Sequence, residues 1–139
     1  MNINNYKYHE ICIGDTFYFQ RYLSIEDIDN YAKLTGDYNP LHCDEEYAKT
    51  TEFNGRIIHG MLASSLFSTL VGMVCPGKKN LYLTQNLNCK RPIYHNSKVT
   101  VKGTIKNKID SIKLISIQTE ILIDGVVMID GEAKVKLME

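Results

Sequence analysis

The sequence lacks any excess of charge of one sign, any long charged tract and any internal repeat. Its 139 residues carry sixteen basic and sixteen acidic side chains, whereas a protein that binds nucleic acid or a membrane surface usually has a basic excess. The remaining composition, with 44% hydrophobic and 23% charged residues, is that of an ordinary globular protein. We therefore expect one domain over residues 1–139, with neither nucleic acid nor a membrane as partner.

Paired cysteines are also missing. Cys12, Cys43, Cys75 and Cys89 are scattered without a CxxC motif, and the first residues show neither the basic flank nor the apolar core of a signal peptide. Both features favour free thiols and a cytoplasmic location.

Only one long uncharged segment occurs, and its polarity does not suit a transmembrane helix. Ile57–Cys75 has 19 residues without a formal charge, but it contains a histidine, two glycines, three serines and a threonine. A single span of that polarity inserts poorly into a bilayer. We interpret residues 60–74 as a helix buried on all sides inside the protein and ended by Pro76-Gly77.

The segment before this helix combines helical and turn signals. Ser24, followed by Asp27, predicts the start of a helix over 25–35, and Gly36 predicts its end. Pro40 disfavours helical continuation, so the run from Gly36 to His42 is predicted to be a loop. After it, Asp44 is expected to cap a short helix over 45–50.

The other segments alternate between apolar and polar residues, as strands do. The predicted strands cover residues 16–23, 81–90, 98–106, 112–123 and 126–137. Asp124-Gly125 predicts a hairpin. We expect a bulge near Leu114 and a bulge or bend at Asp130-Gly131.

A helix that is apolar on every side needs a surface that wraps around it. A strongly curved antiparallel sheet supplies one, and this predicts an α+β hot-dog fold. A single such sheet leaves open edges and one poorly covered helix face. We therefore expect a homodimer or a dimer of dimers.

Two motifs resemble those of the MaoC-like dehydratases, and in particular those of the small (R)-specific enoyl-CoA hydratases. They are Thr35-Gly-Asp-Tyr-Asn-Pro-Leu-His42 and Gly55-Arg-Ile-Ile-His-Gly-Met61. The resemblance covers nearly the whole chain. It implies a hydro-lyase that needs no cofactor or metal and adds water to the double bond of an acyl-CoA thioester.

The same resemblance assigns roles to individual residues. Asp37 and His42 would form the catalytic pair, Asn39 would support their geometry, and Gly60 would offer its N–H to the thioester carbonyl. Ser68 would lie near the substrate, as would Val71 on the same helical stripe. The bulk of Leu66, Leu70 and Val71 suggests short to medium acyl chains.

The residues themselves meet the demands of this reaction. Water must lose a proton as its oxygen attacks the β-carbon, the α-carbon must gain a proton, and charge on the thioester oxygen must be stabilised. We assign Asp37 as the base and His42 as the group that orients water and protonates the α-carbon; the exchanged roles stay open because a coupled pair titrates as a unit. Gly60, at a helix N-terminus, offers an unpaired N–H and the positive end of the helix dipole.

Other interpretations of the polar residues are structural. His59 is expected to donate to a backbone carbonyl near the helix start, and His9 and His95 to lie in exposed loops. Ser64 and Ser68 could equally return hydrogen bonds to the helix backbone. A metal site built from His42, Cys43, Asp44 and His59 matches no common zinc spacing, and no triad-like arrangement supports Cys43 as a nucleophile.

Two other functions remain open at this stage. Hot-dog thioesterases resemble this chain in fold and ligand, but many carry a carboxylate on or beside the central helix, and residues 57–75 contain no Asp or Glu. A non-catalytic acyl-CoA-binding module would not need both Asp37 and His42. CoA and carrier-protein thioesters are not distinguished, although Lys78, Lys79, Lys90 and Arg91 could contact CoA phosphates.

Overall fold

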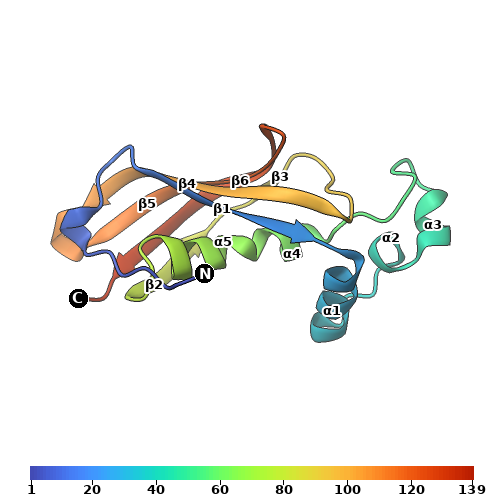
Figure 1. The fold of residues 1–139 in the computed structure, drawn as a ribbon, viewed down its shortest axis with the longest axis horizontal. Helices are drawn as coiled ribbons and strands as arrows, with labels where there is room; N and C mark the ends of the chain where they lie inside the picture. The colour runs from blue at the N-terminus through green and yellow to red at the C-terminus, as the bar shows by residue number, and fades with distance from the viewer.

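A computed structural model describes all residues from Met1 to Glu139. One antiparallel sheet has the strand order β1-β4-β5-β6-β2, and the short β3 pairs with β6. The strands are β1 (Thr16–Leu23), β2 (Asn80–Gln85), β3 (Asn88–Cys89), β4 (Ser97–Ile109), β5 (Leu114–Ile123) and β6 (Val126–Leu137). Figure 1 shows a central helical run along one face of this sheet and three short helices gathered at one end.

The helical segments fall into these two groups and two single turns. The three helices at the end are α1 (Ile25–Thr35), α2 (Pro40–Cys43) and α3 (Glu45–Lys49). The central run consists of α4 (Gly60–Ser64), α5 (Leu66–Thr69) and the π-helical η2 (Leu70–Val74). Single 3₁₀ turns lie at η1 (Tyr8–Glu10) and η3 (Asp110–Ile112). None of the helices has both the length and the apolarity needed to cross a bilayer.

The core lies between the central run and the sheet, as the predicted hot-dog arrangement requires. In one cluster, Phe67 and Leu70 pack with Val99, Val101 and Ile121. In a second, Val71 packs with buried residues of β4, β5 and β6. Burial of these side chains supplies the main favourable term in folding. The sheet therefore fixes the position of the central run, and with it the position of Gly60.

The prediction that residues 60–74 are buried on all sides is wrong for the single chain. Met61, Ser65 and Ser68 are exposed and form one stripe, because residues three and four apart share a helix face. The sheet covers only the opposite face. The run is also less regular than predicted, since α4 and α5 are separated at Ser65 and the last turn is π-helical.

The short-range signals around the loop are confirmed. The Ser24 side chain accepts from Asp27 N–H, while the Asp27 carboxylate accepts from Ser24 N–H, which completes the capping box at the start of α1. Gly36 ends α1 in the left-handed conformation, with φ of 82°. Asp44 caps α3 by accepting from Tyr47 N–H. The loop that follows α1 is therefore held at both ends.

Three strand details differ from the predictions. The segment 81–90 is not one strand, because β2 ends at Gln85 and the chain resumes pairing only at Asn88. Leu114 starts β5 one residue after η3, without a bulge. The register shifts lie instead between Tyr82 and Thr84 of β2, between Ile105 and Asn107 of β4 and between Ile121 and Leu122 of β5.

The third difference concerns Asp130-Gly131, where the β5–β6 ladder runs through without interruption. A glycine is needed at position 131 because the backbone of Asn86 passes too close for a side chain. A Cβ on Gly131 would lie 1.9 Å from the carbonyl oxygen of Asn86, in the crossing between β2 and β3. The glycine therefore lets this crossing lie against β6.

Candidate active site

The loop after α1 brings Asp37 and His42 together. The Asp37 carboxylate accepts from Asn39 N–H at 3.2 Å, and the Asn39 side chain accepts from Leu41 N–H at 3.0 Å. Asn39 thus caps α2, the short helix that carries His42. Asn39 therefore acts on the positions of Asp37 and His42 through two backbone N–H groups, its own and that of Leu41.

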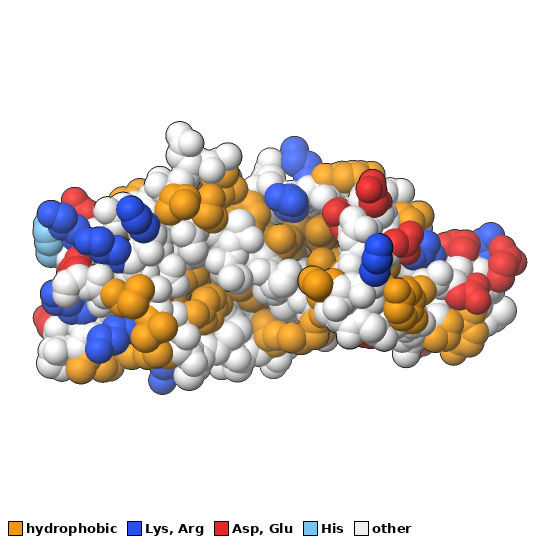
Figure 2. Space-filling view, turned by 90° about the horizontal axis from the view of Figure 1, so that it is seen from below, with side chains coloured by type: hydrophobic (Ala, Val, Ile, Leu, Met, Phe, Trp, Pro, Cys, Tyr) orange, Lys and Arg blue, Asp and Glu red, His pale blue; other side chains and the backbone are white.

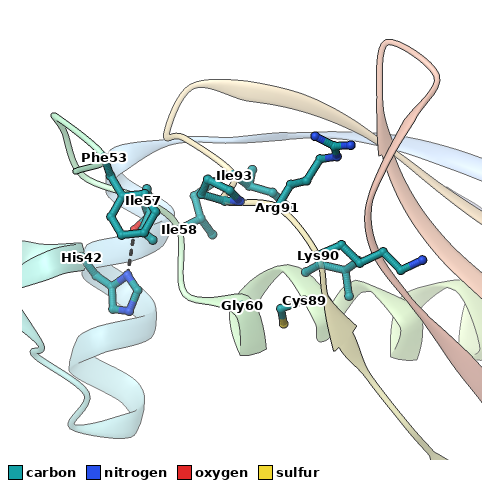
Figure 3. Close-up of a pocket in the computed structure, with 11 residues that line it drawn as sticks. His42, Phe53, Ile57, Ile58, Gly60, Cys89, Lys90, Arg91 and Ile93 are labelled. Atoms are coloured by element: carbon teal, nitrogen blue, oxygen red, sulfur yellow. Dashed lines mark hydrogen bonds between the residues drawn. The ribbon is translucent and has the colours of Figure 1, made fainter. Parts of the chain in front are cut away.

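The orientation of the His42 ring is fixed by one backbone contact. Its Nδ1 lies 2.8 Å from the Ile57 carbonyl oxygen. A carbonyl can only accept, so Nδ1 carries the proton that is donated, and Nε2 is the ring nitrogen left for chemistry. Figure 3 shows this bond beside the cavity described below.

Asp37, His42 and His59 form one cluster. One side-chain ligand atom from each of the three lies within 4.8 Å of the other two. Because a water molecule makes hydrogen bonds of about 2.8 Å, it can bridge atoms roughly 5 Å apart. The carboxylate of Asp37 and the imidazole of His42 are therefore close enough to hold one water between them.

His59 contributes more than the sequence indicated. It is only 2% exposed, and its Nε2 donates to the Asp37 carbonyl oxygen at 3.0 Å, which is a loop carbonyl and not one at the helix start. Its ring stacks on His42 with centroids 4.0 Å apart, and the Tyr31 ring lies 4.7 Å away on a tilted plane. Burial lowers the pKa of His59 and favours the neutral ring, an effect that the hydrogen bond to Asp37 partly opposes.

Arg56 is a residue that sequence reasoning missed. Its guanidinium is buried, with the residue only 8% exposed. Nη2 lies 2.7 Å from the Asp29 carboxylate of α1, and Nε donates to the backbone carbonyl of His42. The one sequence signal was its place inside the second motif, directly before the uncharged segment. Arg56 links α1 to the helix that carries His42.

A cavity of about 280 Å³ opens beside these groups. His42 and Gly60 line it, together with Phe53, Ile57, Ile58, Ile129 and the segment Cys89–Ile93. Figure 3 shows Gly60 at the start of α4, with Cys89 facing it from β3. As the first residue of α4, Gly60 has an N–H without a partner inside the helix. A Cβ on Gly60 would lie 3.0 Å from the Cys89 sulfur, so the glycine keeps this wall open.

Ser68 and Val71 lie outside this cavity. Ser68 is exposed and lines a separate hollow, of about 400 Å³, with Tyr31, Met61 and Gln85. Val71 is fully buried in the core and lines no cavity, so the geometry gives no support for a substrate contact. Ser64 donates to the Gly60 carbonyl at 2.7 Å, which confirms the backbone alternative for that serine.

The remaining candidate residues do not join the cluster. Asp44 is occupied as the α3 cap, and the Cys43 sulfur lies 3.9 Å from the Asp37 carbonyl oxygen. Burial raises the pKa of the Cys43 thiol, which disfavours the thiolate that a nucleophile or metal ligand requires. His9 is exposed as expected, whereas His95 is only partly exposed and its Nδ1 is buried.

Comparison with known proteins assigns the chain to a family. The sequence model described as "MaoC like domain" matches residues 11–126. The chain belongs to the MaoC-like domain family. It is 35% identical over 126 residues to an (R)-specific enoyl-CoA hydratase of Aeromonas caviae, covering 90% of this chain and 94% of that protein. It is 34% identical over 128 residues to an (R)-specific enoyl-CoA hydratase of Rhodospirillum rubrum, covering 92% and 89%.

The fold comparison agrees with this assignment. The solved structure of the R-hydratase PhaJ1 from Pseudomonas aeruginosa, in its unliganded form, superposes with a TM-score of 0.93 at 31% identity. The match covers 99% of this chain and 88% of that one. The predicted resemblance to the MaoC-like dehydratases and the predicted hot-dog fold are both confirmed.

Proposed function

We propose that this MaoC-like protein catalyses the reversible hydration of trans-2-enoyl-CoA to (R)-3-hydroxyacyl-CoA. Similar proteins of this length are named (R)-specific enoyl-CoA hydratases. The observation that carries the proposal is the grouping of Asp37 and His42 within 4.8 Å, next to a cavity that starts at Gly60. An acid–base pair beside an unpaired helix N–H is what water addition to an enoyl thioester requires.

The geometry supports a concerted role for the pair. A water between Asp37 and His42 gives one proton to the Asp37 carboxylate while its oxygen bonds to the β-carbon. As the electron pair of the double bond moves toward the thioester oxygen, protonated His42 delivers a proton from Nε2 to the α-carbon. The proton left on Asp37 returns to His42 through the next water molecule, which restores the pair. Because both groups act from the same side of the double bond, the addition is syn. In the exchanged assignment, the neutral His42 ring takes the water proton at Nε2, and a protonated Asp37 carboxyl supplies the proton to the α-carbon.

The developing negative charge needs a donor at the thioester oxygen. The Gly60 N–H supplies it without reorganisation, because α4 is fixed against the sheet. Losing one such donor costs on the order of 3–4 kcal/mol of transition-state stabilisation in other enzymes. Gly60 would thus bind the oxyanion more strongly than the neutral carbonyl.

The test is turnover of crotonyl-CoA by the purified protein with chiral analysis of the product. Loss of enoyl absorbance and formation of (R)-3-hydroxybutyryl-CoA would support the proposal. Release of free CoA thiol would instead indicate a thioesterase, and tight binding without turnover would indicate a binding module. A series of enoyl-CoA lengths then tests the proposed preference for short to medium chains.

We also propose that the chain works as a homodimer, in a reducing compartment such as the cytoplasm that suits its four free cysteines. The support for a dimer is that apolar side chains are exposed on the helix stripe and on an edge strand of the sheet. Met61 is 61% exposed, and Leu81 and Leu83 of the edge strand β2 are 46% and 47% exposed. Figure 2 shows several hydrophobic patches on the face that is seen from below in Figure 1. Exposed edges and patches of this kind mark interaction surfaces.

A further inference from the structure

We propose that Arg91 forms a subsite for a phosphate on the carrier arm of the substrate. This inference rests on the proposed function and deepens it. The cavity has His42 and Gly60 on one side, while Cys89, Lys90 and Arg91 line another. Figure 3 shows the Lys90 and Arg91 side chains pointing away from His42, with Arg91 beside Ile93 and Lys90 beyond Cys89. A thioester whose carbonyl binds at Gly60 can therefore extend its arm along this wall.

The two neighbouring cations differ in what they contact. Lys90 Nζ lies 2.8 Å from the Asp130 carboxylate, which also accepts from the Asn88 side chain at 3.0 Å. The hydrogen bond from Lys90 is the main reason why the pKa of Asp130 is lowered. The positive charge of Lys90 is thus paired with the Asp130 carboxylate, which holds the Lys90 side chain against β6.

Arg91 has no such partner. Its guanidinium makes no ion pair and no side-chain hydrogen bond anywhere in the structure, and the residue is exposed. Its backbone is nevertheless fixed, because the N–H groups of both Lys90 and Arg91 donate to the Met128 carbonyl, at 2.9 and 3.2 Å. The cavity wall therefore carries one unpaired positive charge on an anchored backbone.

A guanidinium in this setting suits a phosphate. Its planar fork donates two parallel hydrogen bonds to phosphate oxygens, which a lysine cannot do. CoA and the phosphopantetheine group of a carrier protein both carry a 4′-phosphate, and CoA has further phosphates on its nucleotide. The shared chemistry is a phosphate on a pantetheine arm, and the source is decided by experiment.

The experiment compares three thioesters with the same acyl group: crotonyl-CoA, crotonyl-4′-phosphopantetheine and crotonyl-pantetheine. Arg91→Gln should raise KM for crotonyl-CoA roughly tenfold, the size of one charge-assisted hydrogen bond, with kcat within about twofold of wild type. KM for crotonyl-pantetheine should not change. A matching rise for crotonyl-4′-phosphopantetheine would identify the 4′-phosphate, whereas a rise for crotonyl-CoA alone would identify a nucleotide phosphate.

Controls separate this role from a structural one. Arg21→Gln removes the same charge from exposed strand β1 and should leave all three KM values unchanged. Arg91→Lys should recover part of the loss for crotonyl-CoA. An equal rise for all three thioesters, or no rise for any, would overturn the proposal.

Direct binding keeps the inference testable even if the proposed activity is absent. Calorimetric titration with CoA and with pantetheine should show weaker CoA binding to Arg91→Gln than to wild type, with pantetheine binding unchanged. A wild-type protein that binds CoA in this way without hydrating crotonyl-CoA would refute the proposed function and leave the phosphate subsite standing. Equal CoA affinity in the two proteins would refute the subsite.

Discussion

The imidazole of His59 stacks on the imidazole of His42, with the ring centroids 4.0 Å apart. Only His42 lines the cavity, while His59 is buried beneath it and bonded to the Asp37 backbone. The buried, neutral ring of His59 therefore supports the half-buried ring of His42, a member of the proposed acid–base pair.

Stability should fall on mild acidification because of His59. Its pKa is below the ordinary value of 6.5 in the folded state, so the unfolded chain takes up the proton first. The contribution of the neutral ring is complete above that ordinary value and is lost as the pH falls below it, with a limiting slope of about 1.4 kcal/mol per pH unit. Arg56 and His42 face the ring and oppose its protonation, whereas Asp37 favours it. Urea unfolding at pH 7, 6 and 5 measures this loss.

The matched variants for this prediction are His59→Asn and His9→Asn. His59→Asn should flatten the pH dependence between pH 7 and 5, while His9→Asn, on an exposed residue, should keep the wild-type dependence. Identical slopes in both variants would show that His59 is not the group responsible.

Replacing either member of the acid–base pair should remove activity without unfolding the protein. Asp37→Asn retains an oxygen that can accept from Asn39 N–H, so the turn should persist. Each of Asp37→Asn and His42→Ala should lower kcat for crotonyl-CoA roughly 10²–10⁴-fold. Because the two groups act on one water, the double variant should be about as slow as the slower single variant. Multiplicative losses would argue against a shared water.

Gly60→Ala should separate activity from stability. The new Cβ would lie 3.0 Å from the Cys89 sulfur and narrow the cavity where the thioester oxygen is proposed to bind. Misplacement of a reacting group by about 1 Å can cost on the order of 10²-fold in rate, so kcat/KM should fall by up to that amount. Thermal unfolding should be little changed, since alanine favours helices.

Gly72→Ala is the control for Gly60→Ala. It makes the same substitution in the central helical run, and open space surrounds its Cβ position. Activity close to wild type in Gly72→Ala, together with a loss in Gly60→Ala, would place the effect at the cavity. Equal losses would point to a general requirement for glycine in this run.

Arg56→Gln should impair both stability and turnover. It removes charge-assisted hydrogen bonds to the Asp29 carboxylate and to the His42 carbonyl. Such a bond contributes roughly 1.5–3 kcal/mol, and less at Asp29, whose side chain is 57% exposed. The backbone of His42 then loses its anchor to α1, so kcat should fall more than KM rises. Asp29→Asn keeps the Arg56–His42 bond and should retain more activity. Chemical denaturation and initial rates on crotonyl-CoA test both effects, and full activity in Arg56→Gln would rule out the anchoring role.

The proposed dimer predicts that Leu83→Lys dissociates the protein. A charge on the exposed face of β2 would be harmless in a monomer but costly in a buried interface. Sedimentation velocity should show the mass of two chains for wild type and of one chain for Leu83→Lys. Leu34→Lys, on a residue of α1 that is 84% exposed, should leave the dimer intact. A wild-type protein that sediments as one chain would contradict the proposal.

The parts of the fold that depend on neighbouring residues could be predicted from the sequence. Ser24 with Asp27, Gly36 and Asp44 each act within one helical turn, so their spacing alone indicates the helix ends. The motif residues Asp37 and His42 could be found for a related reason. They are only five residues apart in the sequence, and a single capped turn brings them together.

Features that depend on distant contacts could not be predicted. Arg56 matters because it reaches Asp29 and the His42 carbonyl, and Gly131 matters because Asn86 crosses over it. No periodicity or local spacing in the sequence indicates that Arg56 contacts Asp29 and His42, or that Gly131 contacts Asn86. The exposure of Met61 was missed for a different reason, since an apolar helix pattern does not say whether the sheet or another chain covers each face.

The groups proposed for catalysis come from one stretch of the chain, whereas part of the cavity wall comes from a different stretch. Asp37, His42 and Gly60 belong to one continuous stretch that ends at the start of α4, whereas Cys89–Ile93 and Ile129 belong to the sheet and its connections. Mutations in the second set can change which acyl group or carrier arm is accepted while the first set stays in place. Substrate range can therefore diverge among related hydratases, or be redesigned, without rebuilding the reaction centre.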